Sequence, residues 1–229
     1  MNTEEIIHGL AVNARAAAAR MRAFSTASKN AALLAIAEAL EAQKPQIEAA
    51  NAEDVAAAKT AGISASMIDR LTLTEARFKS MVDGVRHVAT LADPVGEVIW
   101  ERDRPSGIHI TKVRQPFGVI AVVFESRPNV FVDTAALCLK TSNAVILRGG
   151  KEALRSNRAL SVAVRAGLEK AGLPVDVVQL VETTDHAGVT ALVRSVGLID
   201  IAIPRGGERL IRAMCEAACI PVLKHYNGI

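Results

Sequence analysis

Five short apolar runs alternate with helix-like segments in the second half of the chain, and this alternation constrains the fold most. Short runs that are apolar throughout are typical of strands buried on both faces. The alternation with helices predicts a parallel sheet of about five strands, with right-handed crossover helices on both faces. The strands are expected at Val119–Phe124, Ala144–Leu147, Val175–Val181, Leu198–Ile203 and Ile220–Leu223, and the helices at about 131–141, 152–171, 187–195 and 207–218.

The first 93 residues carry helical patterning throughout. Ser28 precedes an amphipathic run, and Pro45 allows a second helix to start. Thr74 is typical of the cap of a further helix, which ends before Pro94. Nothing in this segment indicates chemistry, so we expect packing helices.

A β-rich stretch separates the helical segment from the alternating region. Val95–Asp103 and Ile108–Arg114 are joined by the turn Arg104–Gly107, which predicts an antiparallel hairpin. We therefore expect one α/β cofactor-binding domain over 1–229, made of a helical segment (1–93), a hairpin (94–115) and a Rossmann-like sheet (116–229).

Composition excludes several classes of function. Half of the 229 residues are hydrophobic and only 3% are aromatic, while the net charge of +3 is dispersed. A chain without basic blocks or stacking aromatics is not typical of a nucleic-acid binder. Glu4 and Glu5 near the N-terminus argue against a signal peptide or a membrane span.

Three cysteines, Cys138, Cys215 and Cys219, are an odd number, which argues against a disulfide framework and for the cytoplasm. Cys215 and Cys219 have the spacing of half a metal site, but no His or Cys cluster accompanies them, so we expect no metal. Core packing is the expectation for all three.

One short phrase occurs twice, as Arg148-Gly149-Gly150-Lys151 and as Arg205-Gly206-Gly207-Glu208. Each copy follows an apolar run and precedes a helical segment. Glycines let the backbone approach a ligand closely, and a helix N-terminus favours an anion such as a phosphate. Because ligands bind at the carboxyl ends of parallel strands, both turns belong to one edge of the sheet, together with Arg127 and Asn129 after the first strand.

The ordinary nucleotide fingerprints are missing: no G-x-G-x-x-G follows the first strand, and no P-loop occurs. Three longer phrases lie at Phe124–Val130, Cys138–Glu152 and Ile203–Gly207. Together with shorter ones at Asn51–Val55, Asp69–Leu71 and Leu91–Gly96, they resemble the gamma-glutamyl phosphate reductase (glutamate-5-semialdehyde dehydrogenase) family of the aldehyde dehydrogenase superfamily. The resemblance implies NADPH-dependent reduction of L-glutamate 5-phosphate to L-glutamate 5-semialdehyde and phosphate, in proline biosynthesis.

The resemblance also implies roles for the turn residues. Arg148 and Lys151 stand where the superfamily contacts the adenosine ribose, and two cations there suit the 2′-phosphate of NADPH. Gly149 and Gly150 belong to the same turn, while Gly206 and Gly207 offer backbone N–H groups to the pyrophosphate, and Arg205 reaches cofactor or substrate phosphate.

Two residues of the first strand–helix connection are assigned to the reaction itself. Asn129 matches the amide of the superfamily's oxyanion hole, the alternative being a helix cap. Arg127 either binds the acyl phosphate or carboxylate of the substrate or only pairs with Glu125.

None of the three cysteines lies in the family's nucleophile motif, so the thioester cysteine is expected outside this sequence. We expect the chain to match about the N-terminal half of a full member, without the catalytic domain, and to be inactive alone. The alternative is a non-catalytic nucleotide-binding module. The resemblance further implies homo-oligomers through the hairpin near Trp100, and association with the kinase that precedes the reductase in the pathway.

Overall fold

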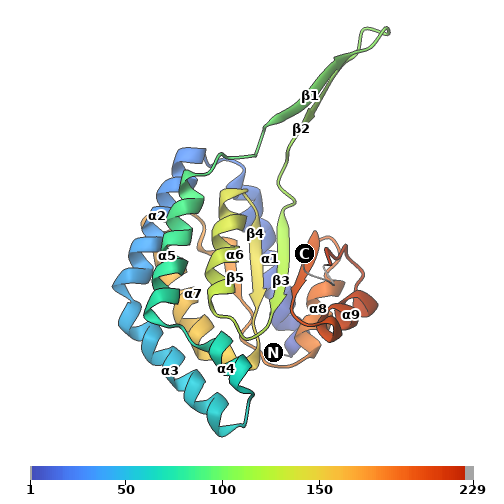
Figure 1. The fold of residues 1–229 in the computed structure, drawn as a ribbon. Coiled ribbons are helices and arrows are strands. Elements are labelled where there is room, and N and C mark those ends of the chain that lie inside the picture. Colours follow the sequence, from blue (N-terminus) through green and yellow to red (C-terminus); the bar gives the residue numbers. More distant parts are fainter. Residues whose placement is uncertain (1, 225–229) are drawn as a thin grey trace.

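The computed structural model describes residues 2–224, which form an α/β body from which a hairpin projects (Figure 1). The N-terminal segment is helical, as predicted. Side-chain caps fix where its helices begin: Ser25 Oγ accepts from the backbone N–H of Ser28 at 3.1 Å, and Thr74 Oγ1 accepts from that of Arg77 at 3.2 Å. The five helices are α1 (Thr3–Met21), α2 (Thr26–Ala42), α3 (Lys44–Thr60), α4 (Ala65–Leu71) and α5 (Glu75–Thr90).

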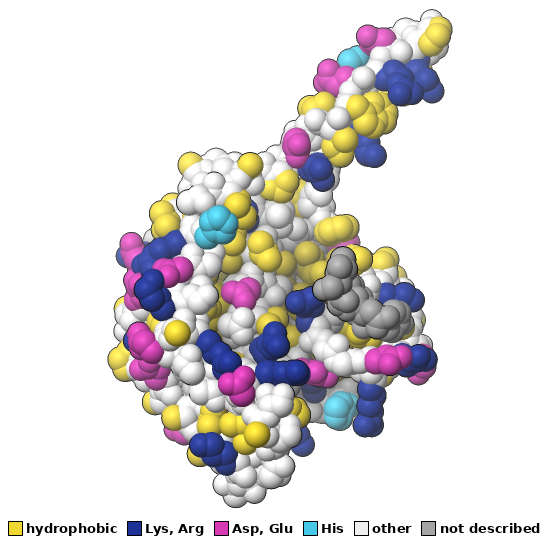
Figure 2. Space-filling model, viewed as in Figure 1, with side chains coloured by type: hydrophobic (Ala, Val, Ile, Leu, Met, Phe, Trp, Pro, Cys, Tyr) yellow, Lys and Arg dark blue, Asp and Glu magenta, His cyan; other side chains and the backbone are white. Residues whose placement is uncertain are grey.

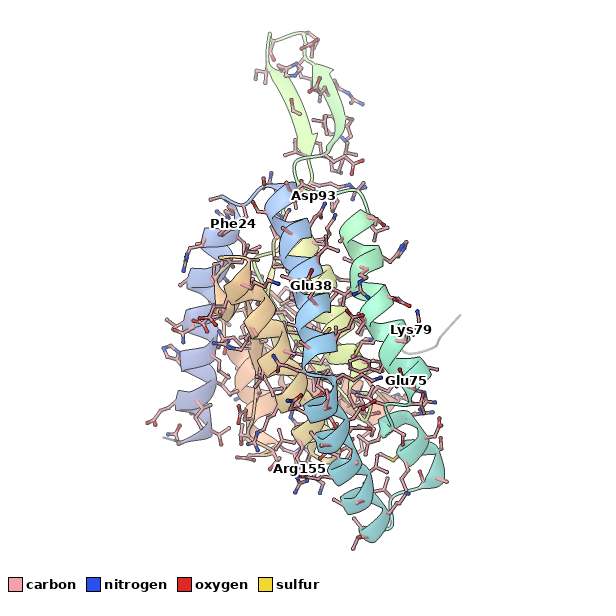
Figure 3. The ribbon with its side chains drawn as sticks, turned by 90° about the vertical axis from the view of Figure 1, so that its left-hand side faces the viewer. Phe24, Glu38, Glu75, Lys79, Asp93 and Arg155 are labelled. Carbon is pink, nitrogen blue, oxygen red and sulfur yellow. The ribbon has the colours of Figure 1, made fainter. Side chains whose placement is uncertain are left out.

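The hairpin consists of β1 (Val98–Asp103) and β2 (His109–Val113), paired antiparallel as predicted. Both strands are exposed along their whole length. At its base, Lys29 Nζ lies 2.5 Å from a carboxylate oxygen of Asp93; the Lys29 side chain is buried and that of Asp93 is largely buried. Figure 3 shows Asp93 where α5 leads into the hairpin. This ion pair ties the start of the projecting arm to α2.

Four parallel strands form the central sheet, in the order β5-β4-β3-β6. Helices α6 and α7 cover one face, and α2, α3 and α5 form an outer layer on them, while α1 and α8 cover the opposite face (Figure 1). The elements are β3 (Val119–Phe124), α6 (Asn129–Lys140), β4 (Ala144–Arg148), α7 (Leu154–Lys170), β5 (Val178–Leu180), α8 (Ala187–Arg194), β6 (Ile201–Arg205) and α9 (Glu208–Ala217), with 3₁₀ turns at Lys151–Ala153 and Val175–Val177.

The prediction of five strands is wrong by one strand within the described residues. The run Ile220–Leu223 makes a single bridge, between Ala202 and Val222. The next step of this ladder needs an N–H donor at position 204, and Pro204 has none, so the pairing stops.

Two other strands are shorter or displaced compared with the prediction. Val175–Val177 forms a 3₁₀ turn, so β5 begins only at Val178. Gly197 has a φ of +79° and turns the chain, and the backbone N–H of Ile199 bonds back to Ser195, so β6 begins at Ile201.

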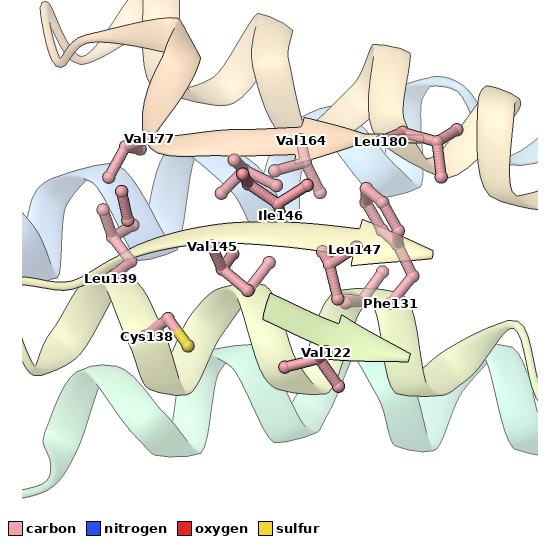
Figure 4. Close-up of a cluster of buried hydrophobic side chains, with 14 of the residues drawn as sticks. Val122, Phe131, Cys138, Leu139, Val145, Ile146, Leu147, Val164, Val177 and Leu180 are labelled. Atoms are coloured by element: carbon pink, nitrogen blue, oxygen red, sulfur yellow. The ribbon is translucent and has the colours of Figure 1, made fainter. Parts of the chain in front are cut away.

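The core is aliphatic and is centred on the two middle strands. Every residue of β3 and β4 is buried, which agrees with helices on both faces. Figure 4 shows Val122, Val145 and Leu147 packed against Phe131 and Cys138 of α6. None of the helices within 2–224 is long and apolar enough to span a bilayer.

Candidate active site at the switch point of the sheet

The connection from β3 to β4 runs through α6 on one face of the sheet, whereas the connection from β5 to β6 runs through α8 on the opposite face, and this places a crevice between the carboxyl ends of β3 and β6. Phe124 and Arg205 are paired across these strand ends. Ligands bind at such a topological switch point in open α/β sheets. A cavity of about 450 Å³ lies here, lined by Met67, Arg70, Phe124–Arg127, Val130 and Pro204–Gly207. The structure thus brings predicted Arg127, Arg205, Gly206 and Gly207 together.

The second Arg-Gly-Gly turn begins a helix directly, and its N-terminus already carries an anion. Gly207 is the N-cap of α9, and its backbone N–H points at the Glu125 carboxylate, with both oxygens at 3.2 Å. Glu125 therefore occupies the place where the sequence predicts a phosphate. A carboxylate is stabilised there by the free N–H groups and the helix dipole, as a phosphate would be.

The first Arg-Gly-Gly turn, at Arg148–Gly150, does not lead directly into a helix. A 3₁₀ turn, Lys151–Ala153, separates its glycines from α7. Arg148 is 8% exposed and donates from Nη2 to the Thr184 carbonyl at 3.3 Å, and burial lowers the pKa of its guanidinium although Glu152 and Asp185 oppose this. The Lys151 side chain is exposed.

Close packing explains Gly149. A Cβ on it would collide with the Asn157 amide and lie 3.1 Å from the Phe124 ring. Glycine is required there by protein neighbours, whereas the sequence reasoning invoked a ligand.

A second cavity, of about 340 Å³, adjoins the crevice and contains Asn129. Asn129 is the first residue of α6, and its Nδ2 donates to Asp133 at 2.9 Å. Burial raises the pKa of the Asp133 carboxyl, against the opposing effect of this hydrogen bond. The helix-cap alternative is not what the structure shows, because no side-chain cap bond occurs at the start of α6.

Arg127 and Arg70 line both cavities. Lys and Arg side chains gather in the middle of the face shown in Figure 2. The guanidinium of Arg127 forms no ion pair with Glu125 in the described part of the chain; only their backbones bond, at 2.6 Å. The pairing alternative for Arg127 is therefore wrong.

Arg70 and Asp133 have no role in the prediction from sequence, and Glu125 enters it only as a possible partner of Arg127. Asp133 is four residues after Asn129, so helical spacing could have found it. Arg70 comes from α4, and no local signal places that helix beside α6.

The cysteines lie away from both cavities. Cys138 is buried in the core, and burial raises the pKa of its thiol to about 12, which disfavours the reactive thiolate. The prediction of core packing is wrong for Cys219, which is exposed where the chain leaves α9, and Cys215 is half-buried. Residues 2–224 hold no group of three His, Cys, Asp or Glu side chains suited to a metal ion.

Unsatisfied polar atoms at the end of β4 fit a dinucleotide. Arg148 Nε and both amide atoms of Asn157 are buried without a hydrogen-bond partner. Such groups favour a ligand that supplies partners, since an unmade bond costs about 1–3 kcal/mol. The α9 N-terminus supplies the matching anion site at the other strand end.

A family model described as "Aldehyde dehydrogenase family" matches residues 1–218. The chain belongs to the aldehyde dehydrogenase family. Gamma-glutamyl phosphate reductase from Thermotoga maritima is similar to it with 39% identity and a TM-score of 0.94 over 97% of this chain and 54% of that one. The enzyme of the same name from Saccharomyces cerevisiae has 36% identity and a TM-score of 0.89, covering 100% of this chain and 57% of that one.

This aldehyde dehydrogenase family chain thus spans about half the length of the reductases it matches. An engineered glycolyl-CoA reductase with bound NADP+ shares the fold, with a TM-score of 0.69 and 14% identity over 97% of this chain and 47% of that one.

Proposed function

We propose that this chain is the cofactor-binding part of a reductase that converts L-glutamate 5-phosphate into L-glutamate 5-semialdehyde and phosphate with NADPH, in proline biosynthesis. The observation that carries the proposal is the crevice between β3 and β6, where three arginines, Arg70, Arg127 and Arg205, lie near the N-terminus of α9. A site with this charge suits a ligand with several phosphates. The names of the two similar reductases supply the reaction.

The residues divide between cofactor and substrate. Gly206 and Gly207 would hold the pyrophosphate, and Arg148 and Lys151, with Gly149 and Gly150 between them, would face the adenosine end. When bound, the nicotinamide supplies the electron pair for the reduction. Arg127 would bind the acyl phosphate.

Asn129 would stabilise the negative charge on the reacting oxygen. Its amide carries two N–H groups, and Asp133 takes one of them, which leaves the other for the oxyanion. We propose that the acyl group passes through a thioester on a cysteine outside these 229 residues, because none of the three here lies at the crevice. If that cysteine does not exist, the chain is a nucleotide-binding module.

Self-association and compartment are part of the proposal. The hairpin exposes Val98, Ile99, Trp100 and Ile110, each at least 37% exposed, and Figure 2 shows hydrophobic side chains along it. An exposed apolar arm favours pairing with a second copy. Three free cysteines favour a reducing compartment such as the cytoplasm. Association with the preceding kinase stays a prediction.

Cofactor choice tests the proposal directly. We expect wild-type protein to bind NADPH more tightly than NADH, and Lys151→Glu to remove roughly 10- to 100-fold of that preference, because a charge-assisted bond contributes about 1.5–3 kcal/mol. Calorimetric titration of both cofactors measures it, with the exposed Lys59→Glu as a charge-matched control. Equal affinities for the two cofactors in wild type and variant would sink the assignment.

Asn129→Ala should lower the turnover of the complete enzyme by about two to three orders of magnitude, because an oxyanion donor contributes about 2.7–4 kcal/mol to the transition state. Steady-state kinetics measure the loss. An unchanged rate would leave Asn129 without a catalytic role.

A further inference from the structure

The 340 Å³ cavity beside the crevice has an unusual balance of charge. Its walls come from α4 and α5 on one side and from the start of α6 on the other. Arg77 and Asp69 neutralise each other there, with Nη2 2.9 Å from Oδ2, and Arg77 also donates to backbone carbonyls. The net charge of this pair is zero, so the charge of the cavity comes from its other side chains.

The other charged side chains of the cavity have no ionic partner among residues 2–224. Arg70 and Arg127 make no side-chain hydrogen bond or ion pair there. The half-buried Asp133 accepts only the amide of Asn129. Because burial raises the pKa of Asp133, a neighbouring cation would favour its ionised form. The cavity thus offers cationic groups and one carboxylate, which is the complement of a zwitterion.

We propose that this cavity binds the α-amino-acid head of the substrate, with Arg70 pairing its carboxylate and Asp133 its ammonium group. That the substrate is a glutamyl compound rests on the proposed function. The assignment names two specificity-determining residues on elements far apart in sequence. Arg127, two residues from Asn129, would then bind the acyl phosphate at the reacting end of the substrate.

The dimensions agree with this orientation. Asn129 Nδ2 lies 2.9 Å from Asp133 Oδ2. An oxygen that accepts from the free Asn129 N–H and an ammonium group on the far side of the Asp133 carboxylate would each lie about 2.9 Å beyond these atoms, so the two can be about 5–6 Å apart. The extended carbon chain of a glutamyl group covers a span of that order between its C5 carbonyl and its α-nitrogen. The reacting carbonyl at Asn129 therefore places the ammonium group near Asp133, and α4 presents Arg70 to the remaining carboxylate.

Three esters separate the two contacts. L-Glutamate 5-methyl ester carries both head groups, monomethyl glutarate lacks the ammonium group, and methyl 4-aminobutanoate lacks the α-carboxylate. We expect Arg70→Gln to weaken binding of the first two by roughly 10-fold or more and to leave methyl 4-aminobutanoate unchanged. Asp133→Asn should weaken the glutamate ester and methyl 4-aminobutanoate to a similar extent and leave monomethyl glutarate unchanged.

The controls are Lys79→Gln and Asp83→Asn, which remove the same charges from an exposed pair on α5 outside the cavity (Figure 3). Neither should alter any affinity. The inference is overturned if wild type binds none of the esters, or if each variant weakens all three equally.

NADPH titration of the same proteins separates the two proposals. Normal NADPH binding without the ester pattern overturns this inference alone. The ester pattern in a protein that binds no nicotinamide cofactor supports the head-group site and contradicts the proposed function.

Discussion

The two Arg-Gly-Gly turns share three letters and differ in almost every contact. In the first, Arg148 is buried and the glycines are followed by a 3₁₀ turn. In the second, Arg205 is exposed and Gly207 caps α9 directly. The first turn is built into the core, whereas the second faces the crevice with a carboxylate already seated on it.

The comparison shows that the glycines of these turns serve two different purposes, close packing and access to the backbone. None of the four glycines has a positive φ, so conformational freedom explains neither turn. Gly149 leaves room for Phe124 and Asn157, while the nearest atom to a Cβ on Gly207 would be a Glu125 oxygen at 3.9 Å. Close approach of protein atoms requires glycine at Gly149 and also at Gly206, where a Cβ would lie 2.6 Å from the carboxyl carbon of Glu125. At Gly207 there is room for a Cβ, and access to the backbone N–H is what distinguishes that position.

Adding a methyl group at each turn gives the largest contrast. Gly149→Ala should lower the free energy of unfolding by about 1–3 kcal/mol, because the new Cβ collides with the Asn157 amide and crowds the buried Phe124 ring. Gly207→Ala should change it by less than about 0.5 kcal/mol, since its Cβ meets only ordinary contacts. Urea unfolding followed by circular dichroism measures both. Equal costs at the two positions would contradict the distinction.

A smaller effect is expected when the carboxylate on the second turn loses its charge. Glu125→Gln should tighten NADPH binding roughly two- to fivefold, because a charge at a helix N-terminus contributes about 0.3–1 kcal/mol and here competes with the cofactor. Titration calorimetry gives the affinities. Glu216→Gln, exposed at the far end of α9, is the matched control. Unchanged or weaker binding in Glu125→Gln would show that the carboxylate does not compete with the cofactor.

Much of the fold could be predicted because its signals are local. The fully apolar runs at β3 and β4 identify buried central strands, and Thr74 marks the start of α5. The ends of the weaker strands could not be predicted, because they depend on the neighbouring strand. Pro204 stops the ladder that would have included Ile220–Leu223.

The candidate site likewise contains residues that the sequence predicts and one that it does not. Strand ends place Arg127, Arg205 and Gly207 at one edge, which a sequence pattern can indicate. Arg70 joins them only because the tertiary fold brings α4 and the start of α6 to the walls of one cavity, and no local pattern around Arg70 indicates this arrangement.

The sequence by itself determined the α/β alternation, the edge of the sheet that carries the polar turns, and the likeness to a reductase family. Only the tertiary structure decided which polar atoms are free for a ligand. Glu125 and Gly207 are 82 residues apart in the chain, yet one occupies the N–H of the other. Whether a donor is available depends on the atoms that fold against it, and those atoms come from distant parts of the chain.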